Sequence, residues 1–185
     1  MTTLYTHAAA GLGIAAVLAP SRMAWPYWCL AAILPVLPDL DTLSMTSSHS
    51  VWGHRGWTHS LACAFVVGLS AAALSGWYFC RGFWRLAVVF CLAAASHALL
   101  DMLTRGGSGV AIWWPFSDLR VGSENWGLIP VSDIALQWPD PRRSRALQAE
   151  LLYVWLPLGI LVAATVGVRS LLSRRKRPAG ASSGQ

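Results

Sequence analysis

Apolar residues in this chain are concentrated in long runs that polar residues seldom interrupt. Three runs, residues 60–79, 86–103 and 151–172, approach the length of about 20 residues at which a helix crosses the hydrocarbon core of a membrane. Two shorter runs, residues 8–20 and 23–37, are separated by a Ser-Arg pair and fit either two short buried helices or a re-entrant pair. The pattern predicts an all-α, polytopic membrane helical bundle of about four to five membrane-embedded segments.

The composition also favours a membrane environment. Of the 185 residues, 55% are hydrophobic and 12% are charged, and the 11 tryptophans outnumber the 8 acidic residues, which departs strongly from an average soluble domain. The length calls for no second domain, so we expect one membrane-embedded domain over residues 1–177 and a disordered tail over residues 178–185. The four cysteines lie inside apolar runs without a CxxC pair, which predicts small packed side chains without disulfides.

Basic residues lie at one side of the apolar runs. Arg81 and Arg85 border the turn between runs 60–79 and 86–103, and an Arg-Arg-Lys-Arg segment at residues 174–177 follows the last run. The positive-inside rule places these segments in the cytoplasm. The net charge of +6 is thereby explained by membrane anchoring, without direct nucleic-acid binding. The connection over residues 104–150 contains five further arginines, so the opposite orientation stays open.

That connection is the long polar segment of the chain. It carries Trp113, Trp114, Trp126 and Trp138 among Gly, Pro and polar residues, a composition typical of segments that lie among lipid headgroups. We therefore expect a Trp-rich interfacial loop that caps a site.

Two aspartate motifs abut or interrupt the apolar runs, where an unpartnered carboxylate is costly. His97 and Asp101 are four residues apart and share one helical face, so both could bind one metal ion or a close pair. Asp39 and Asp41 lie in a Pro-Asp-Leu-Asp segment that ends run 23–37. Carboxylates so spaced suit a divalent cation.

Two histidine motifs complete the set. His54 and His59 lie in the segment HRGWTHS that leads into run 60–79, where Thr58 can cap the helix, and His7 opens the first run. A topology drawn only from hydropathy and basic residues puts all these motifs at the same, non-cytoplasmic end of their segments. This convergence indicates a common site.

Each motif also has a structural interpretation. His97 and Asp101 can be a hydrogen-bonded pair between helices, Asp39 or Asp41 can stop or cap a helix, and a lone His7 can be an interfacial residue. The same holds for His54, and we prefer it for His49. The combination favours a metal site over these separate explanations.

The motifs occur in a fixed order over residues 1–120: Thr6-His7, Pro38-Asp39-Leu40-Asp41, His54-Arg55-Gly56 with Thr58-His59-Ser60, His97 through Asp101, and Trp114-Pro115-Phe116-Ser117. In this order they resemble the YdjM-like family of inner-membrane metal-dependent hydrolases, one bacterial member of which is described as LexA-binding. The resemblance implies a multi-pass protein of the inner (cytoplasmic) membrane. A LexA-type repressor as partner is implied by this resemblance only.

A looser resemblance is to zinc-dependent phospholipase C and P1-type nucleases, in which His and Asp from several helices, including an HxxxD motif, hold a metal cluster. It implies a divalent metal, with zinc favoured over manganese or magnesium. The ligands it implies are His7, Asp39, His59, His97 and Asp101. Because no later HxxxH or HxxxE motif follows, one or two ions are expected instead of three.

The function expected from these motifs is metal-assisted hydrolysis of a phosphoester or other ester at the membrane interface. Asp41, as base or second ligand, and His54 are the further catalytic candidates. Arg55 is expected to bind an anionic substrate and to stabilise developing charge, with Arg120 assisting. Membrane lipids, and a lipid or lipid-linked substrate, are the expected partners.

Two other functions fit parts of the pattern. A metal-free lipid phosphatase with a histidine nucleophile shares an HxxxD motif, but its KxxxxxxRP and PSGH motifs are missing from this sequence. A non-catalytic ion-binding protein or transporter would also use intramembrane His and Asp. Its site should lie nearer the middle of the membrane.

Overall fold

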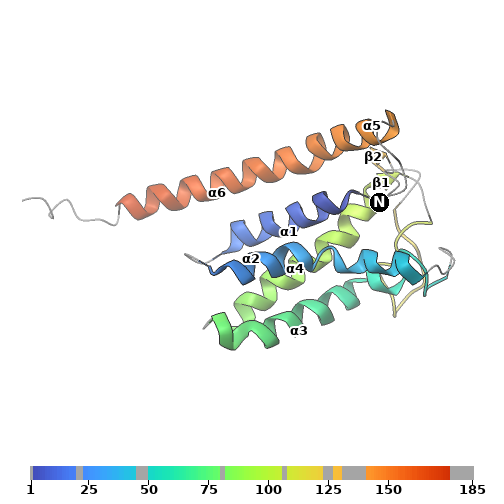
Figure 1. Ribbon diagram of the computed structural model, residues 1–185, viewed down its shortest axis with the longest axis horizontal. Coiled ribbons are helices and arrows are strands. Elements are labelled where there is room, and N and C mark those ends of the chain that lie inside the picture. The colour runs from blue at the N-terminus through green and yellow to red at the C-terminus, as the bar shows by residue number, and fades with distance from the viewer. Residues whose placement is uncertain are drawn as a thin grey trace, which may run out of the picture.

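The computed structural model describes residues 2–19, 23–44, 50–79, 82–105, 108–122, 127–130 and 141–175. The described part is a bundle of helices that run between two opposite ends, with the loops and two short strands at one of them (Figure 1). Its elements are α1 (Leu4–Leu18), α2 (Trp25–Ile33), the 3-10 helices η1 (Leu37–Ser44) and η2 (Trp57–His59), α3 (Leu61–Phe79), α4 (Phe83–Met102), β1 (Thr104–Arg105), β2 (Ile129–Pro130), α5 (Pro141–Glu150), the π-helix η3 (Leu151–Trp155) and α6 (Leu156–Arg175).

Helices α3 and α4 pack closely against each other. They have 19 and 20 residues, about 30 Å each at 1.5 Å per residue, and both are apolar enough to cross a membrane. A Cβ on Gly68 of α3 would lie 2.6 Å from the Cα of Cys91 in α4, so glycine is what lets the two backbones approach so closely. The prediction of two spans here is confirmed, with boundaries shifted by at most three residues.

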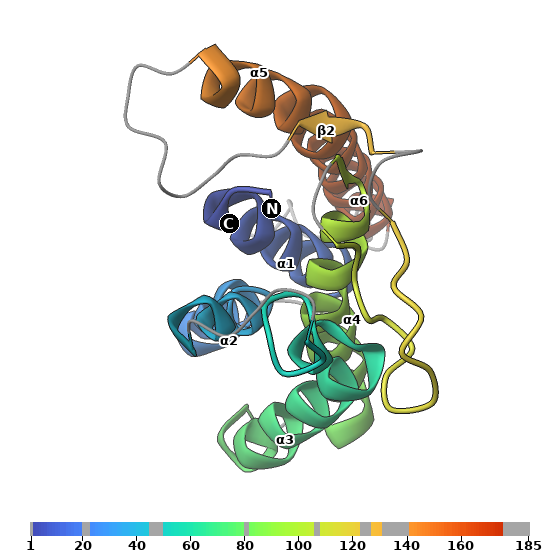
Figure 2. The same cartoon turned by 90° about the vertical axis from the view of Figure 1, so that its right-hand side faces the viewer.

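The two shorter apolar runs form a hairpin. Helix α1 starts at the end of the bundle that carries the loops, and α2 with η1 returns to that end (Figure 1). The hydroxyl of Tyr27 in α2 donates to the carbonyl of Ala15 in α1 at 3.1 Å. Seen end-on, α1 lies between α2 and α6, beside α4 (Figure 2). This pair brings His7 and Asp39 to the same end.

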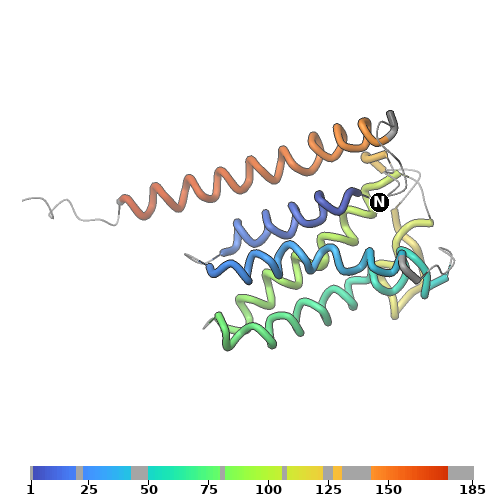
Figure 3. Tube along the Cα trace, in the orientation of Figure 1, coloured from blue at the N-terminus to red at the C-terminus, as the bar shows by residue number. Residues whose placement is uncertain are grey.

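The C-terminal helix begins earlier than the hydropathy pattern predicts. Residues 141–175 are continuously helical, and their trace runs as one rod along the bundle (Figure 3). The expected loop of residues 104–150 therefore includes α5. The arginines of α5 keep it out of the apolar run that follows, but they do not oppose helix formation. Pro141 is tolerated at the first helical position. The π-helix η3 precedes Pro157, whose ring cannot fit a regular α-helical turn.

The first part of the long loop packs onto the bundle end. Val110 and Ile112 are buried against Ala98 of α4, and the backbone N–H of Leu61 donates to the carbonyl of Ile112 at 3.0 Å. Trp113 is exposed. Trp126, Trp138 and the expected disordered tail lie outside the described residues.

Candidate metal centre

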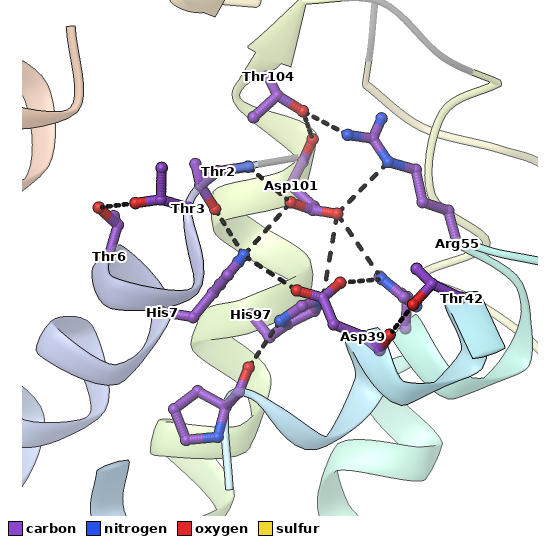
Figure 4. Close-up of polar contacts among 12 residues, drawn as sticks. Thr2, Thr3, Thr6, His7, Asp39, Thr42, Arg55, His97, Asp101 and Thr104 are labelled. Atoms are coloured by element: carbon purple, nitrogen blue, oxygen red, sulfur yellow. Dashed lines mark hydrogen bonds and ion pairs between the residues drawn. The ribbon is translucent and has the colours of Figure 1, made fainter. Parts of the chain in front are cut away.

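Five titratable side chains meet at the loop-bearing end of the bundle. His7 comes from the first turns of α1, Asp39 from η1, and His97 and Asp101 from the last turns of α4 (Figure 4). His59 comes from η2. None of the five is more than 5% exposed. The structure therefore brings together the five residues that the sequence predicts as metal ligands.

Four of them direct one ligand atom each toward a common point. Nε2 of His59 and of His97, a carboxylate oxygen of Asp39 and one of Asp101 all lie within 4.8 Å of one another. The Nε2 of His97 is 3.5 Å from Oδ1 of Asp39 and 4.0 Å from Oδ2 of Asp101. The Nε2 of His59 is 3.7 and 3.6 Å from the same two oxygens.

These separations suit a metal ion better than direct hydrogen bonds. Ligands placed tetrahedrally about 2.1 Å from zinc are about 3.4 Å apart, close to the distances found here. All four atoms are buried and have no hydrogen-bond partner among the described residues, although orphaned buried polar atoms are rare and costly. Two imidazoles and two carboxylates form a donor set suited to zinc. The residues therefore fit a divalent cation.

The opposite nitrogens of both histidines have partners that orient the rings. The Nδ1–H of His97 donates to the carbonyl of Pro35 at 2.6 Å, and Nδ1 of His59 lies 3.2 Å from Oδ2 of Asp41. Such outer partners are typical of metal-binding histidines. Burial alone lowers the pKa of His59, but the carboxylates of Asp39, Asp41 and Asp101 raise it to about 9. A cation that binds Nε2 must therefore displace a proton.

Asp41 also holds His54, at the more accessible edge of the cluster. Its Oδ1 accepts a hydrogen bond from Nδ1 of His54 at 2.7 Å, and its Oδ2 accepts one from the hydroxyl of Thr58 at 2.6 Å. Burial alone raises the pKa of Asp41, but the bonds from His54, His59 and Thr58 outweigh it and hold that pKa well below its ordinary value. The side chain of His54 is 22% exposed, and its Nε2 has no hydrogen-bond partner among the described residues.

A tight turn carries Arg55 to the same cluster. Arg55 has a φ of +64°, and a Cβ on Gly56 would lie 2.0 Å from the carbonyl oxygen of Val51, so this fold of the turn requires glycine next to it. The guanidinium of Arg55 is buried, with Nε 3.4 Å from Oδ2 of Asp101 and Nη2 donating to the hydroxyl of Thr104. Arg55 therefore stabilises the ionised carboxylate of Asp101 and holds it in position.

Arg120 fastens the turn from outside. Its guanidinium donates to the carbonyls of Ser50, Arg55 and Gly109 and to the hydroxyl of Ser108. These bonds tie the long loop to the segment before η2. They give Arg120 a scaffolding contact, beside the substrate contact that the sequence predicts for it.

A second polar network was not predicted from the sequence. Glu150, at the end of α5, is 1% exposed and accepts bonds from the backbone N–H and hydroxyl of Thr3 and from the hydroxyl of Thr6. This carboxylate caps the first turn of α1, which carries His7, from a helix 147 residues away along the chain. The hydropathy pattern places Glu150 at the end of a polar loop. The threonines at the start of α1 are the sequence feature that could have indicated a partner for its carboxylate.

The helical bundle and the buried cluster define the class: an integral membrane protein with a candidate His/Asp metal site at one end of its helices. The chain belongs to the YdjM inner membrane protein family, whose family model matches residues 1–169. The match therefore extends past the motif-bearing residues 1–120 into α6.

A curated relative supports the assignment. The chain is 38% identical to the inner membrane protein YbcI of Escherichia coli (strain K12) over 165 residues, which cover 85% of this chain and 92% of that protein. Together with three helices long and apolar enough to cross a membrane, these matches identify a multi-pass inner-membrane protein. No solved structure is significantly similar to the chain.

Proposed function

We propose that this protein is a metal-dependent hydrolase that acts on a phosphoester at the membrane interface. The observation that carries the proposal is the set of four buried ligand atoms of Asp39, His59, His97 and Asp101, none of which has a hydrogen-bond partner among the described residues. A bound divalent ion such as zinc would supply Lewis acidity and a water of lowered pKa. The site lies at the ends of the helices, which is the level of the lipid headgroups in a membrane.

His54 is the proton acceptor in this proposal. Because Nδ1 of His54 donates to Asp41, the lone pair of its Nε2 is available to take a proton, as in other carboxylate-held histidine bases. Its ring centroid lies 5.2 Å from that of His59, so the base stands next to the ligand cluster. Arg55, against Asp101, adds positive charge on the side where an anionic substrate would dock.

An aromatic rim beside His54 favours a lipid or lipid-linked substrate. The ring centroids of Trp52, Trp57 and Trp114 lie 6.3 to 6.5 Å apart, and Trp52 is 62% exposed. Exposed tryptophans are typical of the headgroup region. A substrate anchored there by its acyl chains would bring its phosphate close to the partly exposed ring of His54.

Purified protein in detergent tests the function. With zinc or manganese present, we expect hydrolysis of at least one substrate in a panel of phosphomonoesters and phosphodiesters that includes phospholipids in mixed micelles. His54→Gln should lower kcat by about 10²- to 10⁴-fold, the usual contribution of a general base, while metal content stays at the wild-type level. The exposed Asp118 offers Asp118→Asn as a control with unchanged kcat.

Metal binding without hydrolysis of any phosphoester or carboxylic ester in the panel would sink the hydrolase proposal. It would favour the alternative, a non-catalytic ion-binding protein or transporter. A rate unaffected by His54→Gln would instead remove this residue from the mechanism.

The side of the membrane that the site faces can be read by cysteine labelling. Arg85 and Arg174 lie at the end opposite the cluster (Figure 1), so we propose a periplasmic site. In a variant without the four native cysteines, an impermeant maleimide should label Trp52→Cys in cells with a permeabilised outer membrane. Gly82→Cys, at the other end and facing open space, should react only after lysis. The reverse pattern would place the site in the cytoplasm, on the side where a LexA-type partner could meet it.

A further inference from the structure

Each of the two carboxylates of the cluster has one oxygen near His59 and His97 and the other oxygen near His7. Oδ1 of Asp39 and Oδ2 of Asp101 are the oxygens near His59 and His97. The other oxygens face His7: its Nε2 lies 4.0 Å from Oδ2 of Asp39 and 3.6 Å from Oδ1 of Asp101. Figure 4 shows His7 on one side of the two carboxylates and His97 extending from α4 beneath them.

We infer that Asp39 and Asp101 bridge two divalent cations, the second of which is held by His7 on the side of α1. This inference rests on the proposed metal site and adds a position to it. The distances from Nε2 of His7 to the two oxygens are too long for hydrogen bonds but match the spread of ligands around a cation. Carboxylate-bridged ions in two-metal sites stand about 3.5–4 Å apart, which fits one ion on each side of the two carboxylates.

Burial supports a second ion. Oδ2 of Asp39 has no hydrogen-bond partner among the described residues and Asp39 is 5% exposed, while His7 is fully buried and stacked on His97 with ring centroids 4.0 Å apart. One cation at the first position would leave this oxygen unsatisfied, which is costly in a buried site. A second cation would satisfy it.

Thr2 shapes the second position. Its hydroxyl lies 2.6 Å from Nε2 of His7, and its backbone N–H donates to Oδ1 of Asp101 at 3.4 Å. A cation bound to Nε2 of His7 would therefore either displace the hydroxyl of Thr2 from this nitrogen or bind that hydroxyl as a further ligand. Nδ1 of His7 also has no partner among the described residues, unlike Nδ1 of His97 and of His59. Since such outer partners are worth about 10- to 100-fold in affinity, the second ion binds more weakly than the first.

Equilibrium dialysis against graded free zinc, followed by elemental analysis, tests this order. Wild type should take up two equivalents in two steps separated by at least about tenfold in concentration. His7→Gln should lose the weaker step and keep the stronger one, and His59→Gln should lose the stronger one. Size-exclusion elution in detergent checks that each variant remains folded.

Manganese gives a measurement that needs no variant. Electron paramagnetic resonance of wild type should show an isolated Mn²⁺ signal at one equivalent and a spin-coupled pair at two. Saturation of wild type at one equivalent, or two steps that survive His7→Gln, would overturn the second position while leaving the proposed hydrolase intact. Binding of no metal at all would instead remove both proposals.

Discussion

Asp101→Asn is expected to abolish retention of divalent metal by the purified protein. Asp101 is fully buried, and its two oxygens lie 3.6 Å from Nε2 of His59 and 3.6 Å from Nε2 of His7. Asparagine keeps the shape of the side chain but removes its charge and one of the two oxygens. Because loss of an outer partner alone costs about 10- to 100-fold, loss of this ligand should lower metal affinity more than a hundredfold. Elemental analysis after size-exclusion chromatography measures the effect.

Two matched variants separate metal loss from general damage. Asp39→Asn removes the other shared carboxylate but leaves the contact between Arg55 and Asp101 in place, so it should lose metal with a smaller loss of stability. Asp118→Asn removes an exposed carboxylate outside the cluster and should keep the wild-type metal content. Full metal content in Asp101→Asn would show that the ion binds elsewhere in the chain.

The membrane spans could be predicted from the sequence because their signal is local. A run of apolar residues such as 60–79 predicts a helix without knowledge of its neighbours, and α3 follows that run closely. The end of the long loop could not be predicted in this way. Its last ten residues form α5, where Arg143 and Arg145 lower the hydropathy without opposing a helix.

The members of the candidate site were predictable for a different reason. Each of His7, Asp39, His59 and Asp101 is a costly polar residue at the end of an apolar run, and a simple up-and-down topology brings these ends together. The sequence could not predict that His7 and His59 would lie at different oxygens of the two carboxylates. It depends on side-chain directions set by tertiary packing, such as the bond from His97 to the carbonyl of Pro35.

The roles of Arg120 and Glu150 show the same limit. Arg120 was expected to contact substrate, yet its bonds to three carbonyls arise from loop geometry that no sequence pattern encodes. Glu150 caps α1 across a separation of 147 residues. Neither contact leaves a periodic or motif-like trace, because both partners are ordinary polar positions in loops and helix ends.

Two buried carboxylates lie close together at this end of the bundle, and a bound metal ion would compensate their negative charge. Asp39 and Asp101 come from η1 and α4, and His7 and His59 from α1 and η2, so one cluster joins four elements of the described chain. Without an ion, the like charges of the two carboxylates repel each other, and both oxygens of Asp39 remain desolvated without a hydrogen-bond partner among the described residues. Metal should therefore act as a cross-link for this end of the bundle.

Removal of metal is accordingly expected to destabilise the protein strongly. A ligand that binds only the folded state stabilises it by about 4 kcal/mol when its free concentration is 1,000 times Kd, and for a chain of this size that corresponds to a fall in Tm of roughly 8–16 °C on chelation. The measurement is thermal unfolding in detergent, with and without EDTA, followed by restoration with zinc. Asp101→Asn should start from a lower Tm and show no response to EDTA, because it has no ion to lose. An equal response of wild type and Asp101→Asn would mean that the chelator acts outside the cluster.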